Sequence, residues 1–250
     1  MKTGLVSISF RKLSPADVIS LTCRSGLGSI EWGGDIHVPP QDLVNAQEVG
    51  QRTRDAGLEV ACYVSYYRLL EADEAPQIAA AAKALGAPLI RVWAGNQGSA
   101  DCPPEQREII RQNAQNLARI AAQEGIDVAF EYHGKTLTDT ADSALALLEA
   151  VNLPNVGTLW QPPVNLPIAD CVASIRKVSR YIRNIHVFSW NGTERLPLQE
   201  GAEKWRACLS EIEKLPGEHR LMMEFVRGDE PQQLVEDAAC LARWLEGSWE

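Results

Sequence analysis

Near its N-terminus the chain contains the stretch Leu5-Val6-Ser7-Ile8-Ser9-Phe10-Arg11-Lys12-Leu13-Ser14-Pro15, in which a short apolar run leads directly into a helix start. Ser14 followed by Pro15 is typical of an N-cap and a first helical residue. The turn at residues 10–14 contains no glycine, so it lacks the glycine-rich phosphate loop of a dinucleotide-binding fold. The chain therefore opens with a strand-to-helix unit of another kind.

Short apolar runs rich in strand-forming residues recur along the 250 residues, and a helical pattern follows each of them. This alternation is typical of βα units that build a parallel sheet. The predicted strands occupy residues 5–9, 29–32, 59–65, 89–93, 128–133, 156–161, 182–188 and 221–226.

The predicted helices have recognisable boundaries, because capping residues and prolines open them and glycines close several of them. Starts are predicted at Ser14-Pro15, Pro39-Pro40, Asp73-Glu74-Ala75-Pro76, Pro103-Pro104, Thr138-Asp139-Thr140, Pro167, Glu200-Gly201 and Glu230-Pro231. Ends are predicted at Gly57, Gly86, Gly125 and Ala150.

The number of units and the length of the chain together predict the fold. The chain has the usual length of one α/β barrel, and no linker, low-complexity tract or charge block divides it. The sequence contains no Walker motif, and the turn after the first strand argues against an open dinucleotide-binding sheet. We therefore predict a single (β/α)8 TIM barrel domain over residues 1–250.

The overall charge argues against a nucleic-acid partner. Lysine and arginine number 24 and aspartate and glutamate 33, so the formal net charge is -9 and the surface repels phosphate backbones. The densest basic stretch, Arg176, Lys177, Arg180 and Arg183, falls on a predicted helix and its exit, where a solvated helix face is the simplest interpretation.

The cysteines and the apolar runs predict where the protein resides. The six cysteines show no CxxC spacing and none lies beside a histidine, which fits a reducing compartment. The N-terminal run lacks the long apolar stretch of a signal peptide, and no apolar run approaches the length of a membrane span. We expect a cytoplasmic protein with no membrane partner.

Polar residues at the ends of the predicted strands indicate the functional site, because such barrels carry their reactive groups there. Glu131 and Glu224 terminate otherwise apolar strands, and His186 occupies the same position on another. A buried carboxylate must be paired, hydrogen-bonded or bound to metal. Imidazole with carboxylates suits a divalent ion, and three such residues on strands five, seven and eight favour this over three separate salt bridges.

These motifs make the sequence similar to the sugar phosphate isomerase/epimerase family, the xylose isomerase-like TIM barrels. The resemblance covers essentially the whole chain. Its most specific parts are Phe130-Glu131-Tyr132-His133, Ile185-His186-Val187 and Met223-Glu224-Phe225.

The resemblance implies a divalent metal ion (Mn, Mg, Zn or Co) held by residues at four strand ends. By motif position these are Glu131, Gln161, His186 and Glu224. Gln161 replaces the aspartate of the family and brings no charge, which weakens the attraction for a cation. Loose binding, binding only with substrate, and loss of the metal all remain open.

The resemblance also implies the chemistry. Family epimerases and isomerases move a proton next to a carbonyl, with one carboxylate removing the proton and another returning it. Glu131 and Glu224 are the catalytic candidates for this pair, acting on a small carbohydrate-like substrate. The metal would stabilise the enediolate charge.

Five further residues are candidates for substrate binding. His133 lies two residues after Glu131 and so faces the same side of its strand, where it either binds substrate or orients Glu131. His37, Trp93, Trp190 and Arg227 follow other strands; Arg227 suits a substrate phosphate or carboxylate, with a surface salt bridge as the alternative.

Two more features point to the mouth of the barrel. Glu31 is either a substrate ligand or a salt-bridge partner. Aromatic residues commonly pack against the apolar face of a sugar, and tryptophans at predicted strand ends suggest such a ligand. These tryptophans are Trp32, Trp93, Trp160 and Trp190.

Other functions are compatible with the same residues. A dehydratase of keto-polyols would use the same metal and base, with His133 or His186 as the acid that protonates a leaving hydroxyl. A zinc phosphodiesterase needs more metal ligands than four histidines supply and a basic surface. A non-catalytic barrel that has lost its metal through Gln161 is the remaining alternative, and homo-oligomers remain open.

Overall fold

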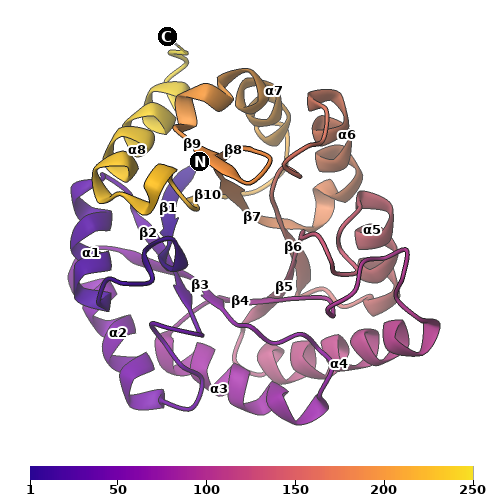
Figure 1. Ribbon diagram of the computed structural model, residues 1–250. Coiled ribbons are helices and arrows are strands. Elements are labelled where there is room, and N and C mark those ends of the chain that lie inside the picture. The colour runs from indigo at the N-terminus through magenta and orange to yellow at the C-terminus, as the bar shows by residue number, and fades with distance from the viewer. Residues whose placement is uncertain (250) are drawn as a thin grey trace.

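The computed structural model describes residues 1–249, in which eight parallel strands close into a barrel, confirming the predicted (β/α)8 fold (Figure 1). Around the barrel the strands follow the order β1-β10-β7-β6-β5-β4-β3-β2, so the first and last strands pair with each other. Their bounds are β1 Lys2–Val6, β2 Ser29–Gly33, β3 Glu59–Val64, β4 Leu89–Val92, β5 Asp127–Glu131, β6 Val156–Trp160, β7 Ile182–Val187 and β10 Arg220–Met223.

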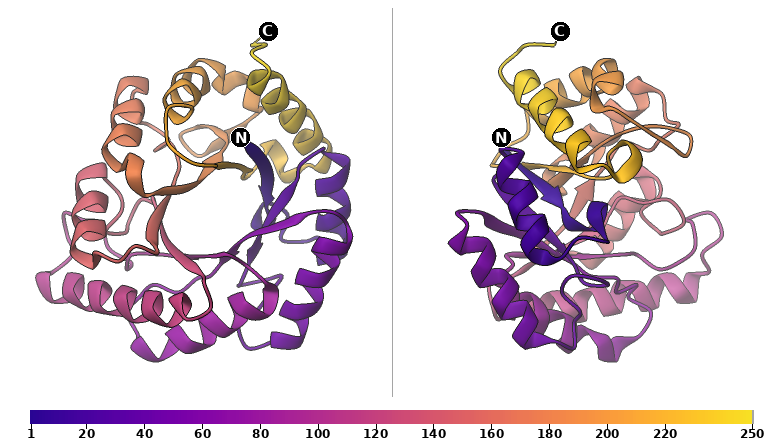
Figure 2. Two further views of the ribbon diagram at one scale, coloured as in Figure 1. Left: turned by 180° about the vertical axis from the view of Figure 1, so that it is seen from behind. Right: turned by 60° about the vertical axis from the view of Figure 1, so that its left-hand side comes forward.

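The helices form an outer ring around these strands (Figures 1 and 2). Each barrel strand is followed by one α-helix before the next barrel strand, as a βα repeat requires. The helices are α1 Pro15–Arg24, α2 Leu43–Asp55, α3 Ala75–Leu85, α4 Pro104–Ala122, α5 Ala141–Val151, α6 Ile168–Val178, α7 Ala202–Ile212 and α8 Pro231–Leu245. Among the described residues, no helix has the length and apolar character needed to span a bilayer.

Most predicted helix starts are confirmed, and one is wrong. The Ser14 side chain accepts the Asp17 backbone N–H at the start of α1, and Thr140 accepts the Ser143 backbone N–H at the start of α5. The second helix does not begin at Pro39-Pro40. It begins at Leu43, because the Asp42 carboxylate caps it by accepting the Asn45 backbone N–H.

The first strand is shifted towards the N-terminus from the predicted residues 5–9. It ends at Val6, and Ser7–Phe10 form a short 3-10 turn. Serine side chains of this turn bind neighbouring segments: Ser7 accepts the Gly33 backbone N–H at the end of β2 at 2.9 Å, and Ser9 accepts the Phe225 backbone N–H at 2.9 Å. Leu5 and Val6 therefore pair in the sheet, whereas residues 7–9 continue the alternation without belonging to a strand.

A second, antiparallel element lies between β7 and α7 and was not predicted. Strands β8, Ser189–Asn191, and β9, Glu194–Leu196, form a short hairpin. Seen from the side, this hairpin projects from the end of the barrel opposite the N-terminus, which is the end where the barrel strands finish (Figure 2).

The buried side chains fall into two layers that follow the period-two alternation of strands. On β5, Val128 and Phe130 belong to the large cluster between strands and helices, whereas Ala129 belongs to a separate small cluster inside the barrel. Glu131 is two residues beyond Ala129 and so points to the same side. The alternation that packs the core thus directs a carboxylate into the barrel.

We predict that Gly50→Ala destabilises the protein although alanine is the better helix former. A Cβ at Gly50 would lie 2.1 Å from the Leu85 carbonyl oxygen, so α2 and α3 would have to separate. The expected loss in free energy of unfolding is about 1–3 kcal/mol, measured by urea denaturation. Gly28→Ala is the matched control, because its Cβ would meet only Thr3 at 3.7 Å. Equal stability of the two variants would contradict this close contact.

Candidate active site

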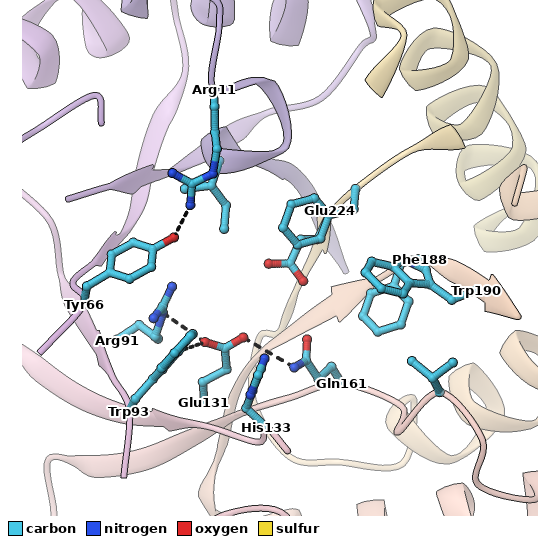
Figure 3. A pocket seen from close by; sticks show the side chains of 13 residues that line it. Arg11, Tyr66, Arg91, Trp93, Glu131, His133, Gln161, Phe188, Trp190 and Glu224 are labelled. Atoms are coloured by element: carbon cyan, nitrogen blue, oxygen red, sulfur yellow. Dashed lines mark hydrogen bonds and ion pairs between the residues drawn. The ribbon is translucent and has the colours of Figure 1, made fainter. Parts of the chain in front are cut away.

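The barrel strands end around a cavity of about 310 Å³ (Figure 3). Its wall combines charged groups from the barrel interior with aromatic rings from the loops. The lining residues are Ile8, Arg11, Tyr66, Arg91, Trp93, Glu131, His133, Gln161, Val164, Phe188, Trp190, Glu224 and Phe225. A cavity of this size accommodates a small polar metabolite.

Glu131, at the end of β5, is held by two hydrogen bonds and one ion pair. Its carboxylate accepts the indole N–H of Trp93, lies 3.2 Å from Nε of Arg91, and accepts Nε2–H of Gln161 at 3.3 Å. Burial alone would raise the pKa of Glu131, but the positive charges of Arg91, His186 and His133 and the hydrogen bond from Trp93 together outweigh it, and the pKa is lowered. Glu131 is therefore an ionised carboxylate in the interior of the barrel.

His186, on β7, lies between two carboxylates. Its Nε2 is 3.0 Å from Oε2 of Glu31, and its Nδ1 is 3.4 Å from Oε2 of Glu224. Asn184 donates to the other oxygen of Glu31 at 2.7 Å. Burial would lower the pKa of His186, but the negative charges of Glu224 and Glu31 raise it well above its ordinary value.

The donor atoms of this centre fit a divalent metal ion. One ligand atom each from Glu131, His186 and Glu224 lie within 4.8 Å of one another. Oε1 of Gln161 and Nδ1 of His186 are buried without a hydrogen-bond partner, as expected for atoms reserved for another ligand. Two carboxylates, an imidazole and an amide oxygen form a donor set that suits such an ion.

Glu31 has the position of a residue that orients a metal ligand. Its hydrogen bond to Nε2 of His186 leaves Nδ1 to face Glu224 and the shared space. Metal-binding histidines commonly donate their second ring N–H to a carboxylate, which fixes the ring and its tautomer. Of the two predicted roles for Glu31, the structure favours the salt-bridge partner, since the residue is fully buried and does not line the cavity.

Three of the predicted substrate-binding residues line the cavity: Trp93, His133 and Trp190. The His133 ring stacks on Trp93 with 4.8 Å between centroids and 21° between planes. Nδ1 of His133 lies 2.6 Å from the Gly134 carbonyl oxygen. Because a carbonyl only accepts, Nδ1 carries the proton, and Nε2 is the nitrogen that can gain or lose one.

His37 and Arg227 do not reach the cavity. His37 is buried elsewhere, with Nδ1 2.9 Å from Oγ of Ser7 and Nε2 3.2 Å from the Leu13 carbonyl oxygen, so both ring nitrogens are used by the protein. Arg227 is exposed in the turn after β10. A position near a strand end in the sequence therefore does not determine whether a side chain points into the cavity.

The four tryptophans do not share one mouth. Trp32 and Trp160 point away from the barrel axis towards the helices, and their indole N–H groups donate to Thr53 of α2 at 3.1 Å and Ser174 of α6 at 3.0 Å. Both alternate with inward-facing residues of β2 and β6. These two are packing residues, and Trp93 and Trp190 alone line the cavity.

Arg91 was not predicted as a site residue, although a signal was present. It is a charged residue between Ile90 and Val92 in an apolar strand, and the same signal identified Glu131. It is 1% exposed, and its Nη1 has no hydrogen-bond partner. The other lining residues that sequence reasoning missed come mostly from loops: Ile8, Arg11, Tyr66, Val164, Phe188 and Phe225.

The sequence pattern of the xylose isomerase-like TIM barrel family matches residues 20–244, so the chain belongs to this family. This agrees with the resemblance drawn from the strand-end motifs and with the closed barrel.

A curated relative, 3-dehydroshikimate dehydratase from Bacillus anthracis, is 27% identical over 248 residues, which cover 85% of this chain and 87% of the relative. Among solved structures, the probable 3-DHS dehydratase AsbF of petrobactin synthesis, also from Bacillus anthracis, superposes with a TM-score of 0.81 at 24% identity, covering 97% of this chain and 99% of that one. L-ribulose 3-epimerase superposes with a TM-score of 0.76 at 17% identity, covering 99% and 95%.

We predict that Glu31→Gln weakens divalent-metal binding about 10- to 100-fold without removing a ligand. The amide keeps the shape of Glu31 but loses the charge that fixes His186. Titration calorimetry with Mn²⁺ measures the effect, and Glu48→Gln on the exposed face of α2 is the control. Unchanged Mn²⁺ affinity of Glu31→Gln would mean that His186 needs no orienting partner.

Gln161→Asp is expected to raise Mn²⁺ affinity, because it adds a negative charge to a centre where the buried amide oxygen already lacks a partner. The same titration measures it. Gln199→Asp, in the turn before α7, changes charge equally away from the cavity and should leave the affinity unaltered. No gain from Gln161→Asp would show that residue 161 does not contact the ion.

Proposed function

We propose that this protein is a metal-assisted dehydratase of a small, hydroxylated keto acid. In this reaction a proton leaves the carbon next to the carbonyl, and a hydroxyl on the following carbon leaves as water. The sequence similarity to 3-dehydroshikimate dehydratase over most of the chain supports this class of substrate.

The buried cation at the cavity wall is the observation that carries the proposal. The guanidinium of Arg91 has one carboxylate neighbour, Glu131 at 3.2 Å, and its Nη1 is buried with no partner. Unmet charged donors away from water are costly, and a planar guanidinium matches a carboxylate in shape and charge. A substrate carboxylate would supply Arg91 with both an acceptor and a negative charge, whereas a neutral sugar would supply only an acceptor.

Tyr66 and Arg11 lie beside Arg91 on the same side of the cavity. Cζ of Arg91 lies 5.0 Å from the ring centroid of Tyr66, and Arg11 donates to the Tyr66 hydroxyl while pairing with Asp35. Figure 3 shows Arg11, Tyr66 and Arg91 on one side of the cavity and the aromatic rings of Phe188 and Trp190 on the other. An anionic end of the substrate would therefore lie towards Arg91, and its ring or chain towards the aromatic side.

Glu131, Gln161, His186 and Glu224 would hold the metal. Bound there, a divalent ion would draw electrons from the substrate carbonyl and stabilise the negative charge that proton removal creates.

The protein side chains would move the protons. Of the predicted pair, Glu131 is committed to two hydrogen bonds and the ion pair with Arg91, whereas Glu224 has His186 alone at 3.4 Å, so we assign the first proton transfer to Glu224. As the C–O bond breaks, protonated His133 would give its Nε2 proton to the leaving hydroxyl, forming water. The Nδ1 bond to Gly134 persists in both protonation states, so the ring need not turn.

An isomerase or epimerase remains the second candidate. The carboxylates of Glu131 and Glu224 point into the same space from β5 and β10 (Figure 3), an arrangement that permits one to remove a proton and the other to return it. In that reaction the proton is exchanged and no water is lost.

The test is turnover with Mn²⁺ of 3-dehydroshikimate and of a neutral ketose in D2O, followed by chromatography and mass spectrometry. We expect the keto acid to lose water.

Glu224→Gln should lower kcat by at least about 1,000-fold. Arg91→Lys keeps the charge beside Glu131 but loses the planar fork, and should raise KM for the keto acid about 10-fold. Arg180→Lys, on the surface, is the control.

Deuterium uptake by the ketose without loss of water would favour the epimerase. Full activity of Glu224→Gln on a confirmed substrate would refute its role as the base. An unchanged KM in Arg91→Lys would refute recognition of a substrate carboxylate by Arg91.

A further inference from the structure

The residue after Glu224 has a strained backbone. Phe225 has φ 53°, in the left-handed region that bulky residues rarely adopt, and its N–H donates to Oγ of Ser9 at 2.9 Å. This left-handed residue directly follows Glu224, and both the Glu224 carboxylate and the Phe225 ring line the cavity. The aim of the carboxylate therefore depends on what holds Phe225.

Arg195, on the β8–β9 hairpin, is the residue that holds it. Its Cζ lies 4.4 Å from the ring centroid of Phe225 and 5.4 Å from that of Trp190. Its guanidinium also pairs with Asp229, which ends the short 3-10 helix Arg227–Asp229 after Phe225. Trp190 is its partner across the hairpin, and the Trp190 and Phe225 rings meet edge to face at 5.8 Å.

We propose that Arg195 is a positioning residue, which clamps Phe225 against Trp190 and thereby keeps the left-handed turn that aims Glu224 into the cavity. This inference rests on the proposed role of Glu224. Arg195 does not line the catalytic cavity; it lies in the neighbouring groove formed by the loops after β1 and β10, so it acts through Phe225 and not on the substrate.

The physical reason is that a strained conformation persists only where its surroundings over-determine it. Three contacts constrain the turn: the hydrogen bond to Ser9, the edge-to-face contact with Trp190, and the Arg195 cation over the ring. Arg195 also joins the hairpin to the loop after β10 through its ion pair with Asp229. Without the cation, Phe225 can relax towards an ordinary φ, which rotates the adjoining peptide and moves Glu224.

The first test compares kinetic constants on the substrate. Arg195→Met keeps an unbranched side chain but removes the charge, and we expect kcat to fall about 10-fold with KM within about 2-fold of wild type. Arg195→Lys keeps a cation over the rings and should recover most of the loss. Arg206→Met, which removes an arginine stacked on Trp249 far from the cavity, is the matched control. A rise in KM with unchanged kcat would overturn the proposal, since it would make Arg195 a binding residue.

The second test does not require a substrate. Hydrogen exchange of the segment 221–230 reports the Phe225 amide, and we expect faster exchange in Arg195→Met than in wild type or Arg206→Met. Unaltered exchange would overturn the clamp whether or not a substrate is found. Faster exchange together with unaltered kcat would overturn the link to Glu224. If wild type turns over no keto acid or ketose, the proposed function fails, while the exchange result still decides the clamp.

Discussion

The contact between Glu31 and His186 is the constraint on which the arrangement of the candidate active site depends. It joins β2 to β7 across the interior of the barrel and turns the free nitrogen of the imidazole towards Glu224, directly after β10. A buried carboxylate and a buried imidazole are each unfavourable alone, so each needs the other. Asn184 completes the hydrogen bonding of Glu31. The direction of the imidazole is thus set inside the barrel, independently of the loops at its mouth.

The barrel and the interior acids could be predicted from the sequence because both follow from alternation along a strand. Glu131 and Glu224 end apolar strands, and the same rule that buries Val128 and Phe130 outwards sends Glu131 inwards. Arg91 follows this rule too. Its charge within an apolar strand is as strong a signal of an inward-facing site residue as the charge of Glu131.

Residues beyond the strand ends could be predicted only in part, because their directions depend on contacts made far along the chain. His37 follows a strand end, as Trp93 does, yet Ser7 and Leu13 use both of its nitrogens. Trp190 was predicted, but the hairpin that carries it was not, because its strands are three residues each and too short for a periodic signal. The left-handed turn at Phe225 is likewise invisible in the sequence, since no glycine marks it.

The pairing of β1 with β10 has a consequence for synthesis of the protein. Residues 2–5 lie against residues 220–223, and Ser9 receives the Phe225 amide, so the ring of strands closes only after most of the chain has been made. Until then both β1 and the most recent strand present open edges, which can pair with other chains. Such distant contacts also slow folding. Rapid closure of the barrel after synthesis of β10 would therefore remove these open edges and with them the sites of aggregation.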